Sequence, residues 1–163
     1  MSNKITQSGL RWLWVALIVI LIDRLTKVIA EYYLVAYHPN PVMPFFNLTL
    51  AYNKGAAFSF LSYAAGWQVW LFGLIAVSIS AILLTWLKRI SFRQRWIAIA
   101  LSLVVGGALG NLWDRVSYGH VIDFIELYVS NWHWPVFNVA DSAICVGAVM
   151  LVIDALFKRD KKI

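Results

Sequence analysis

The feature that most limits how this chain can fold is an uncharged stretch of 21 residues, "WQVWLFGLIAVSISAILLTWL", from Trp67 to Leu87. A helix needs about 20 predominantly apolar residues to cross the hydrocarbon core of a bilayer. The composition agrees, because 61% of the residues are hydrophobic and only 13% are charged, whereas soluble domains are about 45–50% apolar and about 25% charged. We therefore predict an all-α membrane protein, and the length of 163 residues fits one domain over 1–163.

Three more segments are predicted to cross the membrane. The segment 96–113 carries no charge, and the segment 139–157 has Asp141 and Asp154 near its two ends. The first segment has an uninterrupted apolar core of only eleven residues, so a crossing there must include Asp23, Arg24 and Lys27 near its far end. The sequence thus predicts four transmembrane helices, at about 12–30, 67–87, 96–113 and 139–157.

The basic residues indicate how these helices are oriented. Ten of the fourteen Lys and Arg residues fall in three clusters at the ends of apolar segments: Lys4 and Arg11; Lys88, Arg89, Arg93 and Arg95; Lys158, Arg159, Lys161 and Lys162. By the positive-inside rule this predicts that both termini are cytoplasmic. It also explains the net charge of +6 without nucleic acid as a partner. The opposite side of the membrane receives two outer segments, about 31–66 and 114–138.

The outer segments contain signals for more than simple connections. The stretch "NLTLAYNKGAAFSFL" mixes β-branched and aromatic residues with a turn signal at Asn53, Lys54 and Gly55. Such a pattern is typical of short strands separated by a turn. We predict a strand or hairpin that lies at the membrane surface.

Several ionisable residues at the outer ends of the spans need an explanation, because a charge at membrane depth is costly unless it is paired or hydrated. Asp23 and Lys27 are four residues apart in a predicted helix, a spacing that permits an ion pair to anchor the first span. In "GGALGNLWDR", Gly106 and Gly110 form a pair that allows two helices to approach closely.

The end of that same segment combines Asn111, Asp114 and Arg115. Asp114 is expected to pair with a nearby cation. Arg115 is one of very few outer cations, so it is a candidate for holding a peptide carbonyl. A structural role and a binding role for this helix end are both open.

Asp123 and Asp141 are the strongest candidates for chemistry. Asn138 and Asp141 have the spacing of a capping box, and a carboxylate is favoured in the first turn of a helix. Capping leaves Asp123 unexplained, because it stands between apolar residues with no cation at a pairing distance in sequence. The returning outer segment can bring the two aspartates together.

Two neighbouring carboxylates do not both ionise easily, so one keeps a proton near neutral pH. The ionised one can then take a proton from water, and the protonated one can bind a carbonyl and later protonate the leaving amine. This chemistry is peptide hydrolysis of the aspartic type, with no cofactor and no metal. Cys145 is expected to lie too deep in its span to act as a nucleophile, and the three His residues lack the spacing of metal ligands.

Two other functions are compatible with the same aspartates. A small membrane transporter or channel could use them as an ion site, but transporters place such sites near the middle of the membrane, and the acidic residues here gather toward one face. A membrane scaffold could use them only as caps and ion-pair partners.

Five blocks in order resemble those of the bacterial lipoprotein signal peptidases, also called signal peptidase II: "DRLTK" (23–27), "NKGAAF" (53–58), "GGALGNLWDR" (106–115), "VIDF" (121–124) and "FNVAD" (137–141). The resemblance extends over nearly the whole chain. It implies a multi-pass aspartic endopeptidase of the bacterial inner membrane with a periplasmic active site. It also implies a small periplasmic β-cradle and a short periplasmic helix. Such enzymes remove the signal peptide from diacylglyceryl-modified prolipoproteins, just before the lipidated cysteine.

The resemblance also assigns roles to individual residues. It implies that Asp123 and Asp141 are catalytic. It further implies that four polar residues line the substrate site and contact peptide antibiotics of the globomycin type: Asn53, Asn111, Arg115 and Asn138. Supporting roles are expected for Asp23, Lys27, Gly55 and Asp114. The expected partners are the prolipoprotein substrate and membrane lipid, and the expected state is a monomer. Arg24 departs from the family pattern, where many members carry Gln.

Overall fold

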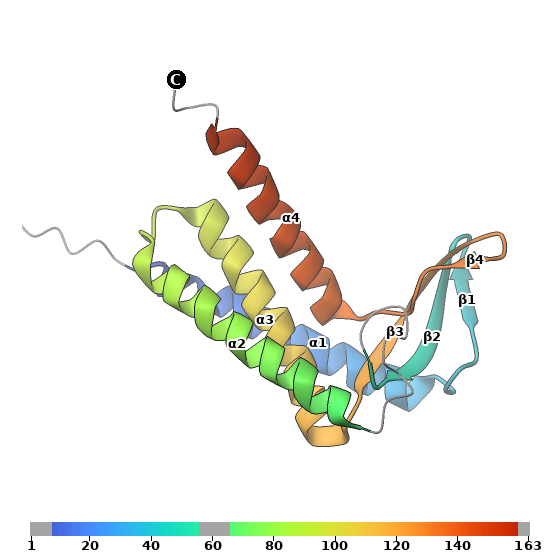
Figure 1. The fold of residues 1–163 in the computed structure, drawn as a ribbon. Helices are drawn as coiled ribbons and strands as arrows, with labels where there is room; N and C mark the ends of the chain where they lie inside the picture. Colours follow the sequence, from blue (N-terminus) through green and yellow to red (C-terminus); the bar gives the residue numbers. More distant parts are fainter. Residues whose placement is uncertain (1–7, 56–65, 160–163) are drawn as a thin grey trace, which may run out of the picture.

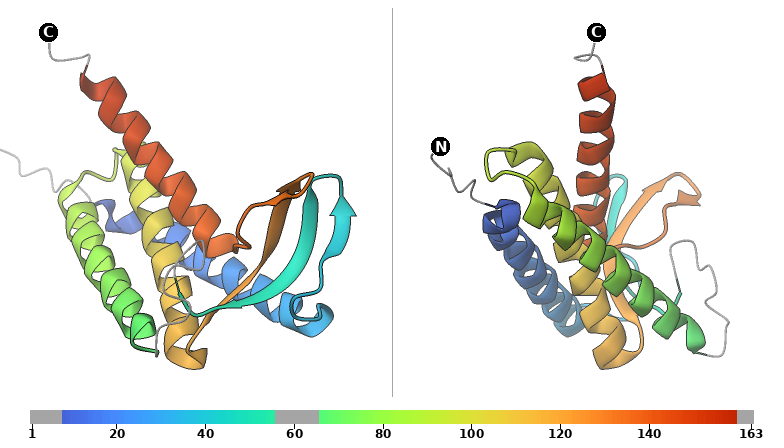
Figure 2. Two further views of the ribbon diagram at one scale, coloured as in Figure 1. Left: turned by 45° about the vertical axis from the view of Figure 1, so that its right-hand side comes forward. Right: turned by 60° about the vertical axis from the view of Figure 1, so that its left-hand side comes forward.

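The structure, a computed structural model, describes residues 8–55 and 66–159. A short 3-10 helix, η1 (Gly9–Trp12), is followed by four α-helices: α1 (Leu13–Tyr33), α2 (Trp67–Arg89), α3 (Arg95–Tyr118) and α4 (Val139–Arg159). Successive helices alternate in direction. The start of α1, the α2–α3 connection and the end of α4 lie away from a small β-sheet, and the sheet lies at the other end of the helices (Figures 1 and 2).

Helix α3 is the centre of the bundle and packs against the other three helices. In its most apolar stretch 67% of the residues are buried, against 11% in α2 and 17% in α4. Small residues allow this contact. A methyl group on Gly106 would lie 2.8 Å from the carbonyl oxygen of Ala16 in α1, and one on Gly110 would lie 2.9 Å from the Asp23 carboxylate. The predicted close approach at Gly106 and Gly110 is therefore present, and it also makes room for Asp23.

Within the described residues, α2, α3 and α4 are long and apolar enough to cross a membrane. Helix α1 has 21 residues, which corresponds to about 30 Å. It differs from the other three in the charged residues within its apolar stretch, among them Asp23 and Lys27. Both of these side chains are buried in the protein, so they do not face the lipid.

The sheet has four antiparallel strands in the order β1 (Asn40–Met43), β2 (Phe46–Asn53), β3 (Val121–Val129) and β4 (Trp132–His133). Strand β2 covers the start of the segment in which a strand was predicted. A turn follows it, in which the backbone N–H of Gly55 donates to the Asn53 side chain over 2.9 Å. The remainder of that segment, where a second strand and the short periplasmic helix were expected, lies outside the described residues. The protein is thus mostly helical with a small antiparallel sheet.

A cluster of apolar side chains joins the sheet to the helices. Leu50 of β2 and Ile122 and Phe124 of β3 pack against Ala30 near the end of α1. The backbone N–H of Ile122 also donates to Asp114 of α3 over 3.3 Å. These contacts hold β3, and with it Asp123, at the ends of α1 and α3.

Candidate active site

A buried ammonium group organises the polar ends of α1 and α3. Lys27 Nζ lies 2.7 Å from Asp23 and 2.7 Å from Asp114, and its side chain is fully buried. It also donates to the Asn111 amide oxygen over 3.1 Å. Asp23 in turn accepts a hydrogen bond from the backbone N–H of Ala140 at the start of α4. The predicted Asp23–Lys27 ion pair is present, and it ties α1, α3 and α4 together.

Arg24 is part of the same network. Its guanidinium pairs with Asp114 over 3.0 Å and donates to the Tyr118 hydroxyl over 2.6 Å. Asp114 was expected to pair with a nearby cation, and it pairs with two, Lys27 and Arg24. At the residue where this chain departs from the family pattern, the arginine adds an ion pair between α1 and α3.

Asn138 and Asp141 form the capping box predicted for α4. The Asp141 backbone N–H donates to the Asn138 side chain over 2.8 Å, and the Asn138 backbone N–H donates to the Asp141 carboxylate over 3.2 Å. This reciprocal arrangement satisfies two N–H groups at the helix start. It also fixes the direction in which the Asp141 carboxylate points.

Side-chain amides connect Asp141 to Asp123. The Asn138 amide nitrogen donates to Asp123 over 2.7 Å and to the Asn111 amide oxygen over 3.0 Å. Asn111 donates to Asp141 over 2.7 Å, and Asn53 donates to the second Asp123 oxygen over 3.1 Å. Residues from β2, β3, α3 and α4 therefore converge on one pair of carboxylates.

Both aspartates line one cavity of about 610 Å³. Its polar side also contains Asn53, Gly55, Asn111 and Arg115. Arg115 donates to the carbonyl oxygens of Asn111, over 3.2 Å, and of Gly55, over 3.4 Å. Its Nε is buried and has no hydrogen-bond partner among the described residues.

The electrostatics of Asp123 differ from those of an ordinary carboxyl group. Burial raises its pKa, and the negative charge of Asp141 raises it further, whereas the hydrogen bonds from Asn53 and Asn138 lower it. The result is a pKa of about 7. Near neutral pH this carboxyl therefore holds its proton in a substantial part of the molecules, which is a condition for general acid catalysis.

Asp23, Lys27 and Asp114 do not line the cavity. Asn138, which was expected to line the substrate site, does not line it either and is fully buried, so it contacts the two aspartates from within the protein. The cavity also has an apolar side, which no pattern in the sequence predicted. It is formed by Leu127 of β3, by Ile144, Cys145 and Val146 of α4, and by residues 134–137. Cys145 lines this cavity one helical turn after Asp141. The aromatic residues just before Asn138 were the feature of the sequence that could have indicated this apolar side. No group of three or more His, Cys, Asp or Glu residues in the described part of the chain could hold a metal ion.

The chain is similar to known proteins over nearly its whole length. Residues 15–157 match the family model for signal peptidase (SPase) II. The lipoprotein signal peptidase of Pseudomonas fluorescens is 55% identical over 99% of this chain and 96% of its own length. That of Photorhabdus laumondii is 47% identical over 99% and 97%.

A solved bacterial membrane enzyme superposes with a TM-score of 0.83 at 31% identity, covering 94% of this chain and 92% of the other. A second one superposes with a TM-score of 0.78 at 29% identity, covering 90% and 92%. From the family match and these identities, the chain belongs to the signal peptidase II family and is a peptidase.

Proposed function

We propose that this chain is an aspartic endopeptidase that removes the signal peptide from diacylglyceryl-modified prolipoproteins and cuts just before the lipidated cysteine. Asp123 and Asp141 act as the catalytic pair. Asn53, Asn111, Arg115 and Asn138 hold the substrate and the two carboxylates. No metal or cofactor takes part, and the enzyme acts as a monomer.

One observation carries this proposal: two carboxylates from different elements are joined through side-chain amides at the wall of a single cavity. An enzyme that hydrolyses a peptide bond with carboxylates alone needs one protonated and one ionised group close to the same bond. A cap or an ion-pair anchor does not require a second carboxylate without a cation. Within the described residues, the salt bridges found involve neither Asp123 nor Asp141.

The contacts of the two groups suggest separate roles. Asp123, with its pKa of about 7, is the general acid. Asp141 accepts from Asn111 and from the Asn138 backbone, and it lies in the first turn of α4, where the helix dipole stabilises negative charge. It is therefore the general base.

In the reaction, Asp141 takes a proton from the attacking water while Asp123 gives its proton to the carbonyl oxygen of the substrate. The tetrahedral diol then collapses as a carboxyl proton passes to the leaving amine, and the peptide bond breaks. Arg115 and Asn53, which both line the cavity, orient the substrate backbone.

The arrangement of the helices supports a position in the bacterial inner membrane. The sheet and both aspartates lie at one end of the helices, and the described basic residues of the α2–α3 connection lie at the other end (Figure 1). We propose that all four helices cross the membrane, with both termini cytoplasmic and the sheet acting as a periplasmic cradle. The cavity then meets a lipid-anchored substrate at the depth of the membrane surface. Two observations argue against a transporter. Asp114, Asp123 and Asp141 lie near the sheet end of the helices, and Asp23, in the middle of α1, is buried in an ion pair with Lys27.

The first test compares two substrates that differ only in the lipid. The purified protein in detergent is expected to cut a diacylglyceryl-modified prolipoprotein before the modified cysteine and to leave the unmodified form intact. Mass spectrometry of both products identifies the cleaved bond, and a globomycin-type peptide is expected to stop the reaction. Equal cleavage of the unmodified form would show that the enzyme does not recognise the lipid of its substrate.

The pH dependence tests the role of Asp123. Because the acid must be protonated, kcat/KM is expected to fall as the pH rises through about 7, and to fall about tenfold per pH unit well above that value. Asn53 donates to Asp123 and lowers its pKa, so Asn53→Ala should move this descending limb to higher pH. A profile that stays level up to about two pH units above that pKa in the wild-type enzyme would contradict the assignment of Asp123 as the acid.

A further inference from the structure

A second cluster of polar side chains lies on the sheet, apart from the two aspartates. The Glu126 side chain is 9% exposed and lies on β3 three residues after Asp123. Because side chains of a strand alternate between its faces, these two carboxyl groups point to opposite sides of the sheet. Asp123 lines the cavity and Glu126 does not.

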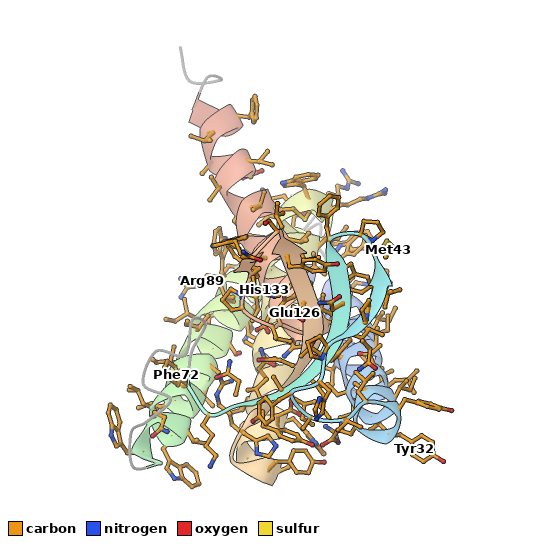
Figure 3. The ribbon with its side chains drawn as sticks, turned by 90° about the vertical axis from the view of Figure 1, so that its right-hand side faces the viewer. Tyr32, Met43, Phe72, Arg89, Glu126 and His133 are labelled. Atoms are coloured by element: carbon orange, nitrogen blue, oxygen red, sulfur yellow. The ribbon has the colours of Figure 1, made fainter. Side chains whose placement is uncertain are left out.

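Glu126 joins three strands through its two carboxylate oxygens. Asn47 and Thr49, both on β2, donate to one oxygen. Nδ1 of His133, on β4, lies 2.7 Å from the other oxygen. Figure 3 shows the Glu126 and His133 side chains next to each other on the sheet.

The charge state of Glu126 determines which group donates the hydrogen bond between Glu126 and His133 of β4. Burial raises its pKa, but the hydrogen bonds from Thr49, Asn47 and His133 outweigh burial and hold the pKa below its usual 4.5. Near neutral pH the group is therefore ionised and only accepts hydrogen bonds, so Nδ1 of His133 carries the hydrogen. A hydrogen bond to an ionised acceptor is about twice as strong as one between neutral groups.

His133 directly precedes a wall of the cavity. Strand β4 has only two residues, and its neighbour Trp134 donates its backbone N–H to Leu127 over 2.8 Å. The chain then reaches Phe137, whose backbone bonds to Ile125 of β3. All four residues of 134–137 line the cavity, and the Glu126–His133 contact lies at one end of this wall.

We propose that Glu126 and His133 form a clasp that positions the wall 134–137 and thereby sets how tightly the apolar part of the substrate is held. Both are positioning residues, because neither lines the cavity and neither reaches the two aspartates. The inference rests on the proposed function for the nature of the substrate. It assigns the sheet a part in substrate binding that is separate from the catalytic step.

The test replaces His133 in two ways. His133→Leu removes the donor, whereas His133→Asn places an amide N–H close to the position of Nδ1 and can restore the bond to Glu126. We expect His133→Leu to raise KM for the lipidated prolipoprotein about tenfold, as for loss of a hydrogen bond to a charged group. Its kcat should stay within about twofold of wild type, with the same descending pH limb. His133→Asn should keep KM close to wild type.

Two further variants complete the comparison. His38→Leu removes an exposed histidine from another outer segment and should leave KM unchanged. Glu126→Gln removes the charged acceptor and should raise KM as His133→Leu does. The His133 side chain is 49% exposed, so its replacement should not prevent folding, which the thermal unfolding temperature checks.

Hydrogen exchange gives a readout that does not depend on activity. In His133→Leu the Trp134 amide should exchange faster than in wild type, with no change in α3. Equal KM values for His133→Leu and wild type, or an equally raised KM in His133→Asn, would overturn the clasp. If the wild-type enzyme does not cut the lipidated substrate, the proposed function fails instead, and the exchange of Trp134 still decides whether the clasp holds the wall.

Discussion

Asp123→Asn and Asp141→Asn should each lower kcat for the lipidated prolipoprotein by about 10²- to 10⁴-fold, the range expected for loss of a general acid or base. Asparagine has nearly the shape of aspartate but cannot exchange a proton in this step. In Asp141→Asn the new amide oxygen can still accept from the Asn138 backbone, so the start of α4 should be kept. The measurement is a cleavage assay on purified variants whose unfolding temperature is first compared with wild type.

A matched control for the two aspartates is available on the same helix. Asp154→Asn removes a carboxylate near the other end of α4, a helix of 21 residues, at about three and a half turns from Asp141. This variant should leave kcat within about twofold of wild type. If either Asp123→Asn or Asp141→Asn cuts within about tenfold of the wild-type rate, that aspartate serves only as a cap or an anchor. The assignment of Asp123 and Asp141 as the catalytic pair would then be wrong.

Lys27→Met should produce the largest loss of stability in the protein. The side chain is fully buried and neutralises Asp23 and Asp114, each 2.7 Å from Nζ. Removing one partner of a buried ion pair leaves an uncompensated charge and costs about 3–5 kcal/mol in the free energy of unfolding. Chemical unfolding in detergent micelles, followed by tryptophan fluorescence, measures this loss.

Two related variants sharpen this prediction. Arg24→Gln removes the other cation of Asp114, but the Arg24 side chain is 29% exposed, so the cost should be about 1 kcal/mol or less. The double variant Lys27→Met, Asp23→Asn removes one of the two buried carboxylates that Lys27 neutralises. Part of the stability lost in Lys27→Met should therefore return. A single Lys27→Met variant as stable as wild type would show that the buried network does not hold α1 to α3.

Local patterns in the sequence predicted a large part of this fold. Helices α2, α3 and α4 were visible from their uncharged apolar stretches, because length and hydropathy alone decide whether a helix can cross a bilayer. The capping box of Asn138 and Asp141 and the ion pair of Asp23 and Lys27 were visible because both are set by a spacing of three or four residues within one helix.

Contacts between distant segments were harder to predict. Strand β3 was treated only as part of an outer segment, although its pairing with β2 places Ala51 opposite Asp123. The apolar wall 134–137 and the position of Cys145 in the cavity were missed for the same reason. Nothing local in the sequence indicates which strand lies beside which helix.

The sequence by itself determined that the chain is an apolar, mostly helical protein with most of its acidic residues toward one end, since hydropathy, helix spacing and capping act over a few residues. The tertiary structure alone decided that Asn138 reaches Asp123 and that Asn111 reaches Asp141. It also decided that burial and the neighbouring charge raise the Asp123 pKa to about 7. The physical reason is that desolvation and hydrogen bonding depend on neighbours in space, and Asn53, which donates to Asp123, is 70 residues away from it in the chain.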